Sequence, residues 1–226
     1  KVNIKEIIGL DALRLLKDRN FAIFFIASIL ICIPLAFYYQ TAHPFLTNVG
    51  MENPTGKMTI GQGSEVLFLM LLPIFFSRFG FKKTILVGML AWALRYILFA
   101  YGNAGELGFM LIIGIALHGI CYDFFFVSGQ IYTNAKAGER YKSSAQGLIT
   151  LATYGIGMLI GFEVAGAITD AYKTGENSFD YKMIWTIPAA IAFAVMILFL
   201  VAFRDEKKKD LVLEKAGNAQ ASGSIS

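Results

Sequence analysis

Charged residues are scarce in this sequence. Asp, Glu, Lys and Arg make up 16% of its 226 residues, against about 25% in an ordinary soluble domain. Hydrophobic residues make up 56%, and the mean hydropathy is +0.59. This deficit of charge, together with 20 phenylalanines, is typical of a polytopic membrane protein.

Cysteine and catalytic motifs are also scarce. Cys32 and Cys121 both fall within apolar runs, so we expect packing residues rather than a disulfide. The sequence has no zinc-protease helix motif, no cysteine pair at metal-ligand spacing, no nucleophile elbow and no phosphate-binding loop. We therefore expect no enzyme, no metal site and no cofactor. The chain opens at Lys1 with neither an initiator Met nor a signal peptide, which predicts a piece of a longer protein.

Six apolar runs each have about the 20 residues that cross the hydrocarbon core of a bilayer. They predict an all-α membrane protein with six transmembrane helices. The runs cover residues 21–41, 58–76, 84–101, 107–131, 144–168 and 183–203.

Three regions follow from this pattern. Residues 1–19 are expected to form an amphipathic linker helix on the cytoplasmic surface, because apolar and basic residues alternate there at helical spacing. Residues 20–203 form the six-helix transmembrane bundle, and residues 204–226 a disordered cytoplasmic tail. Within the bundle, residues 43–57 carry two of the five prolines and are expected to form a loop.

Lys and Arg are distributed unequally between the connecting segments. Sixteen fall in the N-terminal segment, the second-to-third and fourth-to-fifth connections and the tail, whereas only Lys57, Lys173 and Lys182 fall on the opposite side. The positive-inside rule therefore predicts that both termini are cytoplasmic. The net charge of +4 comes from these segments, so it indicates membrane topology rather than nucleic-acid binding.

The second run carries Gln62 and Glu65, which stand three positions apart and hence on one helix face. Gly61 and Gly63 beside them would permit another backbone or a ligand to approach closely. Since an ionisable group within a span is costly to bury, the pair indicates a functional site. Its oxygens could accept hydrogen bonds from hydroxyl groups, while a polar clamp between helices is the alternative.

The fourth run carries a polar and aromatic cluster. At helical spacing His118, Tyr122 and Phe125 share one face, and Asp123 and Phe126 lie on an adjacent face. Aromatic rings can stack on a flat ring or a sugar, while Tyr, His and Asp can bind its polar edge. A carboxyl group within the membrane could also carry a proton, although an internal hydrogen-bond network with His118 is an alternative.

Arg95 stands in the middle of the third run. We expect it to pair with a carboxylate on a neighbouring helix rather than to contact a ligand. Glu163 lies near the outer end of the fifth run, where we expect an interfacial position.

Several of these segments resemble the nucleoside–proton symporters of the major facilitator superfamily. The basic turn Arg78-Phe-Gly-Phe-Lys-Lys83 resembles the signature loop of the superfamily, with Ser77 where that motif has Asp. Three further segments are similar to the symporters themselves: Gly61-Gln-Gly-Ser-Glu65, residues 91–102, and Tyr122-Asp-Phe-Phe followed by Ser144-Ala-Gln-Gly147. The resemblance implies the C-terminal six-helix half of a twelve-helix carrier.

The resemblance also implies roles for particular residues. In that family a Gln and a Glu on the second helix, and an aromatic–Asp cluster on the fourth, contact the nucleoside. The matching positions here are Gln62, Glu65, Tyr122, Asp123 and Phe126. Asp123 matches the membrane-embedded Asp and is therefore the expected proton-coupling residue. His118 stands where the family has Tyr, and it is included with Gln62, Glu65, Tyr122 and Phe126 as substrate-binding.

The expected function is proton-coupled uptake of nucleosides across a bacterial inner membrane by alternating access, with this chain forming one wall of the cavity. The implied partners are the nucleoside, the proton, membrane lipid and the missing N-terminal half of the carrier. One alternative is a major facilitator carrier for sugars or another polar metabolite. A second is a six-span membrane enzyme or assembly subunit that uses Glu65, His118 and Asp123.

Overall fold

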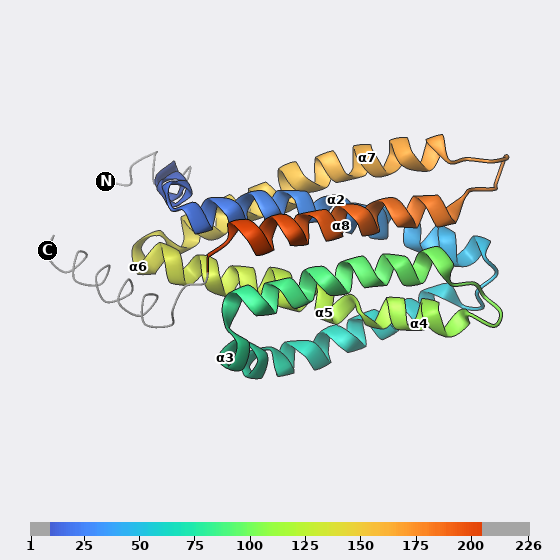
Figure 1. The fold of residues 1–226 in the computed structure, drawn as a ribbon, viewed down its shortest axis with the longest axis horizontal. Helices are drawn as coiled ribbons and strands as arrows, with labels where there is room; N and C mark the ends of the chain where they lie inside the picture. The colour runs from blue at the N-terminus through green and yellow to red at the C-terminus, as the bar shows by residue number, and fades with distance from the viewer. Residues whose placement is uncertain (1–9, 205–226) are drawn as a thin grey trace, which may run out of the picture.

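The computed structural model describes residues 10–204, which form an elongated bundle of helices (Figure 1). The predicted linker helix over 1–19 is described only from residue 10, where a 3₁₀ helix, η1, covers Leu10–Lys17. The predicted disordered tail lies outside the described residues from position 205 onward. The elements that follow η1 are α2 (Arg19–Asn48), α3 (Pro54–Tyr101), α4 (Gly108–Ala116), α5 (His118–Tyr122), the π-helix η2 (Asp123–Val127), α6 (Ser128–Thr150), the π-helix η3 (Leu151–Gly157), α7 (Met158–Ala171) and α8 (Tyr181–Ala202).

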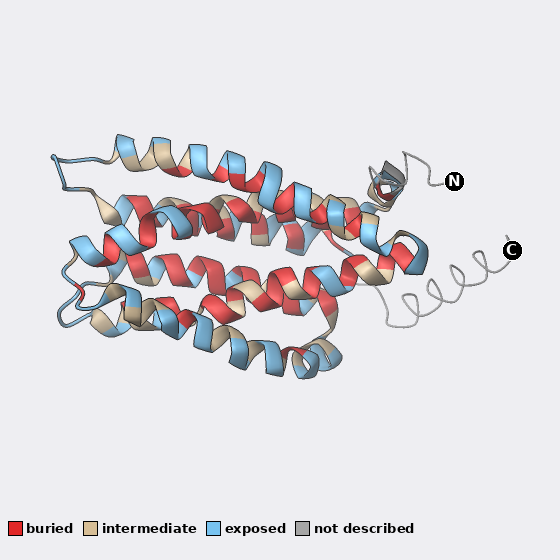
Figure 2. Cartoon of the chain, turned by 180° about the vertical axis from the view of Figure 1, so that it is seen from behind, coloured by how far each residue is buried: buried red, intermediate tan, exposed pale blue. Residues whose placement is uncertain are grey.

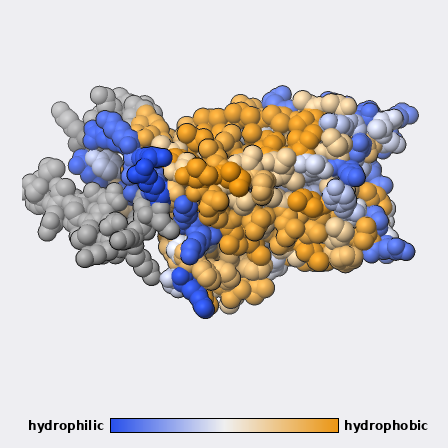
Figure 3. Space-filling view, viewed as in Figure 1, coloured by the Kyte–Doolittle hydropathy of each residue, from blue (hydrophilic) through white to orange (hydrophobic). Residues whose placement is uncertain are grey.

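Four continuous helical stretches are long and apolar enough to cross a membrane. They cover Arg19–Asn48, Pro54–Tyr101, Gly108–Ala171 and Tyr181–Ala202. Figure 3 shows hydrophobic residues covering the middle of the bundle and hydrophilic residues gathered at its two ends. A band of this kind matches the hydrocarbon core of a bilayer between two polar interfaces, which confirms the prediction of a helical membrane protein.

A glycine interrupts each of the two longest stretches. Gly80 in α3 has φ 77° and ψ 174°, and Gly138 in α6 has φ 65° and ψ 175°. Only glycine adopts this region of backbone space freely, because a Cβ atom would clash there. At Gly80 the chain turns back, so that the two parts of α3 run beside each other (Figure 1).

The first connection differs from the sequence prediction. Residues 43–57 were expected to form a loop, yet α2 continues through Pro44 to Asn48. Phe45 is buried and packs edge-on against Trp185, with ring centroids 5.4 Å apart. This burial offsets the backbone hydrogen bond that Pro44 cannot donate, so the last turns of α2 stay helical.

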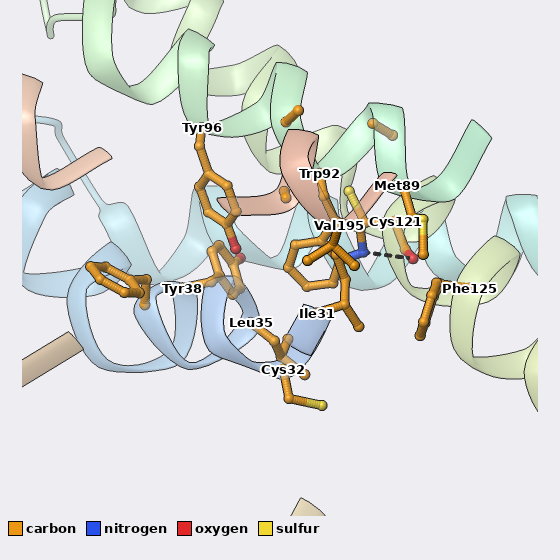
Figure 4. Packing of buried hydrophobic residues seen from close by; sticks show 14 of the residues in the cluster. Ile31, Cys32, Leu35, Tyr38, Met89, Trp92, Tyr96, Cys121, Phe125 and Val195 are labelled. Carbon is orange, nitrogen blue, oxygen red and sulfur yellow. Dashed lines mark hydrogen bonds between the residues drawn. The ribbon is translucent and has the colours of Figure 1, made fainter. Parts of the chain in front are cut away.

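Buried residues face the interior of the bundle (Figure 2), where aromatic rings pack among aliphatic and sulfur-containing side chains (Figure 4). Tyr96 of α3 stacks on Trp185 of α8 at 5.5 Å, and Trp92 donates from Nε1 to the carbonyl oxygen of Cys121 at 3.1 Å. Cys121 and Cys32 are both buried and free, as the sequence predicted. A polar contact within the apolar core therefore ties α3 to α5.

The two ends of the described chain meet at one end of the bundle. Asn20, at the start of α2, donates from Nδ2 to the carbonyl oxygen of Arg204 and accepts from its backbone N–H, at 3.1 and 3.0 Å. Lys82 donates to the carbonyl oxygen of Phe203 at 2.6 Å. Residues 20, 82 and 204 thus lie at the same end.

Candidate functional site

Ionisable side chains lie inside the apolar bundle at three positions that the sequence analysis singled out. Arg95 is fully buried, and His118 and Asp123 are each 3% exposed. Arg95 comes from the second part of α3, His118 from the start of α5, and Asp123 from the start of η2. Burial of such groups is costly unless they are paired, so their contacts determine what each can do.

Arg95, His118 and Glu65 form a continuous hydrogen-bonded chain. Arg95 Nη1 lies 2.8 Å from His118 Nδ1, and His118 Nε2 lies 2.8 Å from Glu65 Oε1. Arg95 was expected to pair with a carboxylate on a neighbouring helix; instead its hydrogen-bond partner is the imidazole of His118, and only His118 contacts the carboxylate of Glu65. Glu65 is the accessible end of the chain, with 31% of its side chain exposed.

Tyr38 of α2 braces this chain. The Arg95 guanidinium lies 3.5 Å from the centre of the Tyr38 ring, which is a cation–π contact. The same ring stacks on His118, with centroids 5.1 Å apart and planes inclined by 25°. Tyr38 therefore holds both the guanidinium and the imidazole in place.

Close backbone packing sets the register between α3 and α5. Gly119 donates its N–H to Ser64 Oγ at 2.9 Å, and a Cβ atom on Gly119 would fall 2.5 Å from the carbonyl carbon and oxygen of Ser64. Gly61 is also close to α5: an ideal Cβ atom on Gly61 would lie 3.4 Å from the Cβ atom of His118. An ideal Cβ atom on Gly63 would meet nothing within 4 Å, so the close backbone approach expected at Gly63 is found at Gly119 instead.

An aromatic cluster lies one turn beyond His118. The Tyr122 and Phe126 rings are 5.1 Å apart, and Tyr154 of η3 stacks on Phe126 at 6.2 Å. The Tyr122 and Tyr154 hydroxyl groups are hydrogen-bonded to each other. Tyr154 was missed by the sequence analysis, although an aromatic residue among the glycines of the fifth run was a usable signal.

The predicted pairing of Tyr122 with Phe125 on one helix face is wrong. Phe125 points into the core, where it packs against Phe24 at 6.2 Å, and Phe126 contacts Tyr122 instead. The reason is local: residues 123–127 are π-helical, which changes the angular spacing of the side chains. Such π-bulges occur frequently at functional sites.

Asp123 and Gln62 complete the set of predicted residues. Asp123 Oδ2 is buried without a hydrogen-bond partner among the described residues. The expected alternative, a bond between Asp123 and His118, does not form, because the two His118 nitrogens meet Arg95 and Glu65. Gln62 is exposed on the same helix as Glu65. The structure thus joins Glu65 with His118, and Tyr122 with Phe126.

Within residues 10–204, no group of three or more His, Cys, Asp and Glu side chains could hold a metal ion. Glu163 is exposed on α7, and the exposed His43 contacts Thr55 at 3.0 Å. Glu65, Tyr122 with Phe126, and Asp123 therefore offer a carboxylate acceptor, an aromatic surface and a buried carboxyl group.

Comparison with known proteins gives consistent results. The chain is 44% identical over 212 residues to YegT of Escherichia coli K12, a candidate nucleoside transporter, covering 91% of this chain and 50% of YegT. It is 31% identical over 209 residues to the nucleoside permease NupG of the same organism, covering 88% and 50%. A crystal structure of a NupG mutant superposes with a TM-score of 0.78 at 30% identity, over 87% of this chain and 51% of that one.

The chain spans about half the length of the curated relatives that it matches. A model of the nucleoside H⁺ symporter family matches residues 1–208, which is most of the chain. With that match and the shared fold, the chain belongs to the nucleoside H⁺ symporter family.

Proposed function

We propose that this chain is one half of a carrier that moves nucleosides together with protons into a bacterial cell across its inner membrane. Family membership and the names of the relatives support nucleosides as the substrate class. The half-length match supports a second half, and paired halves that rock about a site near the bilayer midplane are a common carrier design. This chain would form one wall of the cavity.

We propose further that the chain crosses the membrane six times. The breaks at Gly80 and Gly138 would divide two of the long helical stretches into two crossings each. An even number of crossings agrees with the contact between Asn20 and Arg204 at one end of the bundle. Lys82 and Lys136 lie at this end too, so the positive-inside rule supports a cytoplasmic location for it.

In this proposal Glu65 accepts hydrogen bonds from the ribose hydroxyl groups, and Gln62 both accepts hydrogen bonds from them and donates to them. Tyr122 and Phe126 pack on the rings of the nucleoside, since their aromatic rings contact each other and the Tyr122 ring lies beside His118, the residue that binds Glu65. His118 belongs to the substrate site through its bond to Glu65. Asp123 takes up and releases the coupled proton, because its Oδ2 atom has no hydrogen-bond partner in the described part of the chain that would hold it permanently charged.

The observation that carries this proposal is the accessible carboxylate of Glu65, held by a buried His118 within an apolar bundle. A carboxylate held in this way is a hydrogen-bond acceptor placed where a hydroxyl-bearing ligand could replace water. Membership of the symporter family then supports ribose as the source of those hydroxyl groups.

The test is competition for uptake by the full-length carrier in proteoliposomes. We expect radiolabelled uridine to enter, and unlabelled nucleosides to compete with it where hexoses and other polar metabolites do not. Entry of a sugar without entry of uridine would favour the alternative carrier. Conversion of a substrate into a chemically different product would favour a membrane enzyme.

A further inference from the structure

We infer that His118 is a positioning residue whose neutral ring, fixed by Arg95, aims its Nε2–H at Glu65 and so holds Glu65 as a dedicated hydroxyl acceptor. The hydrogen-bond geometry carries this inference, and only the identity of the ligand rests on the proposed function. His118 would then act on the ligand through Glu65 rather than by touching it.

The direction of each hydrogen bond follows from the chemistry of the donors. A guanidinium group carries N–H donors and no acceptor. Since Arg95 Nη1 lies 2.8 Å from His118 Nδ1, that nitrogen must accept and cannot carry a proton. The ring proton therefore sits on Nε2, which donates to Glu65 Oε1 at 2.8 Å. A doubly protonated ring would point an N–H at the Arg95 donor and lose this contact.

Arg95, at the buried end of these hydrogen bonds, is held firmly in place. Arg95 is fully buried, and the Tyr38 ring covers its guanidinium at 3.5 Å. The stacking of Tyr38 on His118 fixes the plane of the imidazole. Rotation of the ring by 180° would bring carbon atoms against both Arg95 and Glu65, so the hydrogen bonds select one orientation.

Exposure separates the residue that positions from the residue that binds. His118 is 3% exposed, and both of its ring nitrogens are occupied, so it has neither surface nor hydrogen-bonding capacity for a ligand. The Glu65 side chain is 31% exposed, and the bond to His118 engages its Oε1 atom. A carboxylate has two oxygens, so Oε2 is left to accept from a ligand.

This arrangement predicts a preference for ligands that carry hydroxyl donors at the point of contact. An ionised carboxylate accepts hydrogen bonds but donates none. A ligand that lacks the hydroxyl would leave the acceptor dehydrated and unpaired, which costs binding free energy. In a nucleoside carrier the donors would be the 2′ and 3′ hydroxyl groups of ribose.

The tautomer can be tested without any transport measurement. In ¹⁵N spectra of the histidine-labelled full-length carrier in detergent micelles, the His118 signals are those lost in the His118→Met variant. We expect an unprotonated Nδ1 and a protonated Nε2 that correlates with a directly bonded hydrogen. A protonated Nδ1, in either the neutral or the charged ring, would overturn the inference whether or not the carrier takes up uridine.

A variant series tests the action on the ligand. His118→Gln retains an acceptor for Arg95 and a donor for Glu65, His118→Asn can reach only Arg95, and His118→Met provides neither. We expect His118→Met and His118→Asn to weaken uridine binding about tenfold, with His118→Gln close to the unaltered protein. Binding of 2′,3′-dideoxyuridine, which lacks the ribose hydroxyl groups, should change little across the series.

The two ligands distinguish positioning from a general packing role. Equal losses for uridine and dideoxyuridine would overturn the inference, as would unchanged uridine binding in all three variants. Glu65→Leu, which has no acceptor for the His118 Nε2–H, provides the matched control: adding His118→Met to it should cause little further loss, because both changes break the same interaction. If the unaltered carrier binds no uridine, the proposed function fails and the tautomer measurement still decides this inference.

Discussion

Replacement of Gly119 by Ala should separate α5 from α3 at the point where the Glu65–His118 contact is made. The new Cβ atom would lie 2.5 Å from the carbonyl carbon and oxygen of Ser64 and 2.7 Å from the Glu65 nitrogen. Nonbonded carbon atoms prefer separations of about 3.5–4.0 Å. All three obstructing atoms are backbone, so no side chain can rotate away and the helices must move apart by roughly 1 Å.

The magnitude follows from two opposing contributions. Overpacking of this kind costs about 1–3 kcal/mol, whereas alanine in place of a helical glycine contributes up to about 1 kcal/mol of stability. We therefore expect a net loss of roughly 1–2 kcal/mol, equivalent to a fall of about 2–8 °C in melting temperature for a chain of this size. The displacement should also weaken uridine binding, because it lengthens the bond between His118 and Glu65.

Thermal unfolding in detergent can be followed with a thiol-reactive fluorogenic dye, because Cys32 and Cys121 are fully buried until the protein unfolds. Gly63→Ala is the matched control: Gly63 lies on the facing helix α3, next to Ser64, with nothing within 4 Å of its ideal Cβ position. We expect that variant to be as stable as the unaltered protein or slightly more so. Equal melting temperatures for Gly119→Ala and Gly63→Ala would show that the close approach of α5 to α3 does not depend on Gly119.

Two further predictions follow from the backbone and from the aromatic cluster. Gly80→Ala and Gly138→Ala should each cost about 1–3 kcal/mol of stability, because both positions have positive φ with ψ near 180°; melting temperatures matching that of the helical control Gly147→Ala would contradict this. Tyr154→Phe should weaken uridine binding about fivefold by removing the hydroxyl contact with Tyr122. Tyr154→Leu should weaken it further because it also removes the stacking on Phe126, and identical affinities for the two variants would argue against a role for that ring.

Much of the fold was predictable because membrane helices have a strong sequence signal. The apolar runs and the basic turn around Gly80 identified the helical membrane protein, and family membership confirms a symporter relative rather than an enzyme. The end of α2 was not predictable from Pro44. Whether a helix continues past a proline depends on tertiary burial, here of Phe45, which a local pattern does not contain.

The candidate site was predictable as separate residues and not as an arrangement. Glu65 and His118 each stood out because polar side chains are rare in apolar runs. Their connection to Arg95 depends on the register of three helix segments, which the spacing within any one segment leaves open. Periodicity also failed where η2 is π-helical, since the expected faces assume 3.6 residues per turn and misplaced Phe125.

We proposed that the carrier couples nucleoside entry to protons through Asp123. The most direct test is accumulation of uridine in proteoliposomes that contain the full-length carrier, with an inward proton gradient, beside the Asp123→Asn variant. We predict accumulation that collapses when a protonophore dissipates the gradient, and a variant that still exchanges uridine across the membrane but no longer accumulates it. Gradient-driven accumulation by Asp123→Asn at the level of the unaltered carrier would contradict a role for Asp123 in proton coupling.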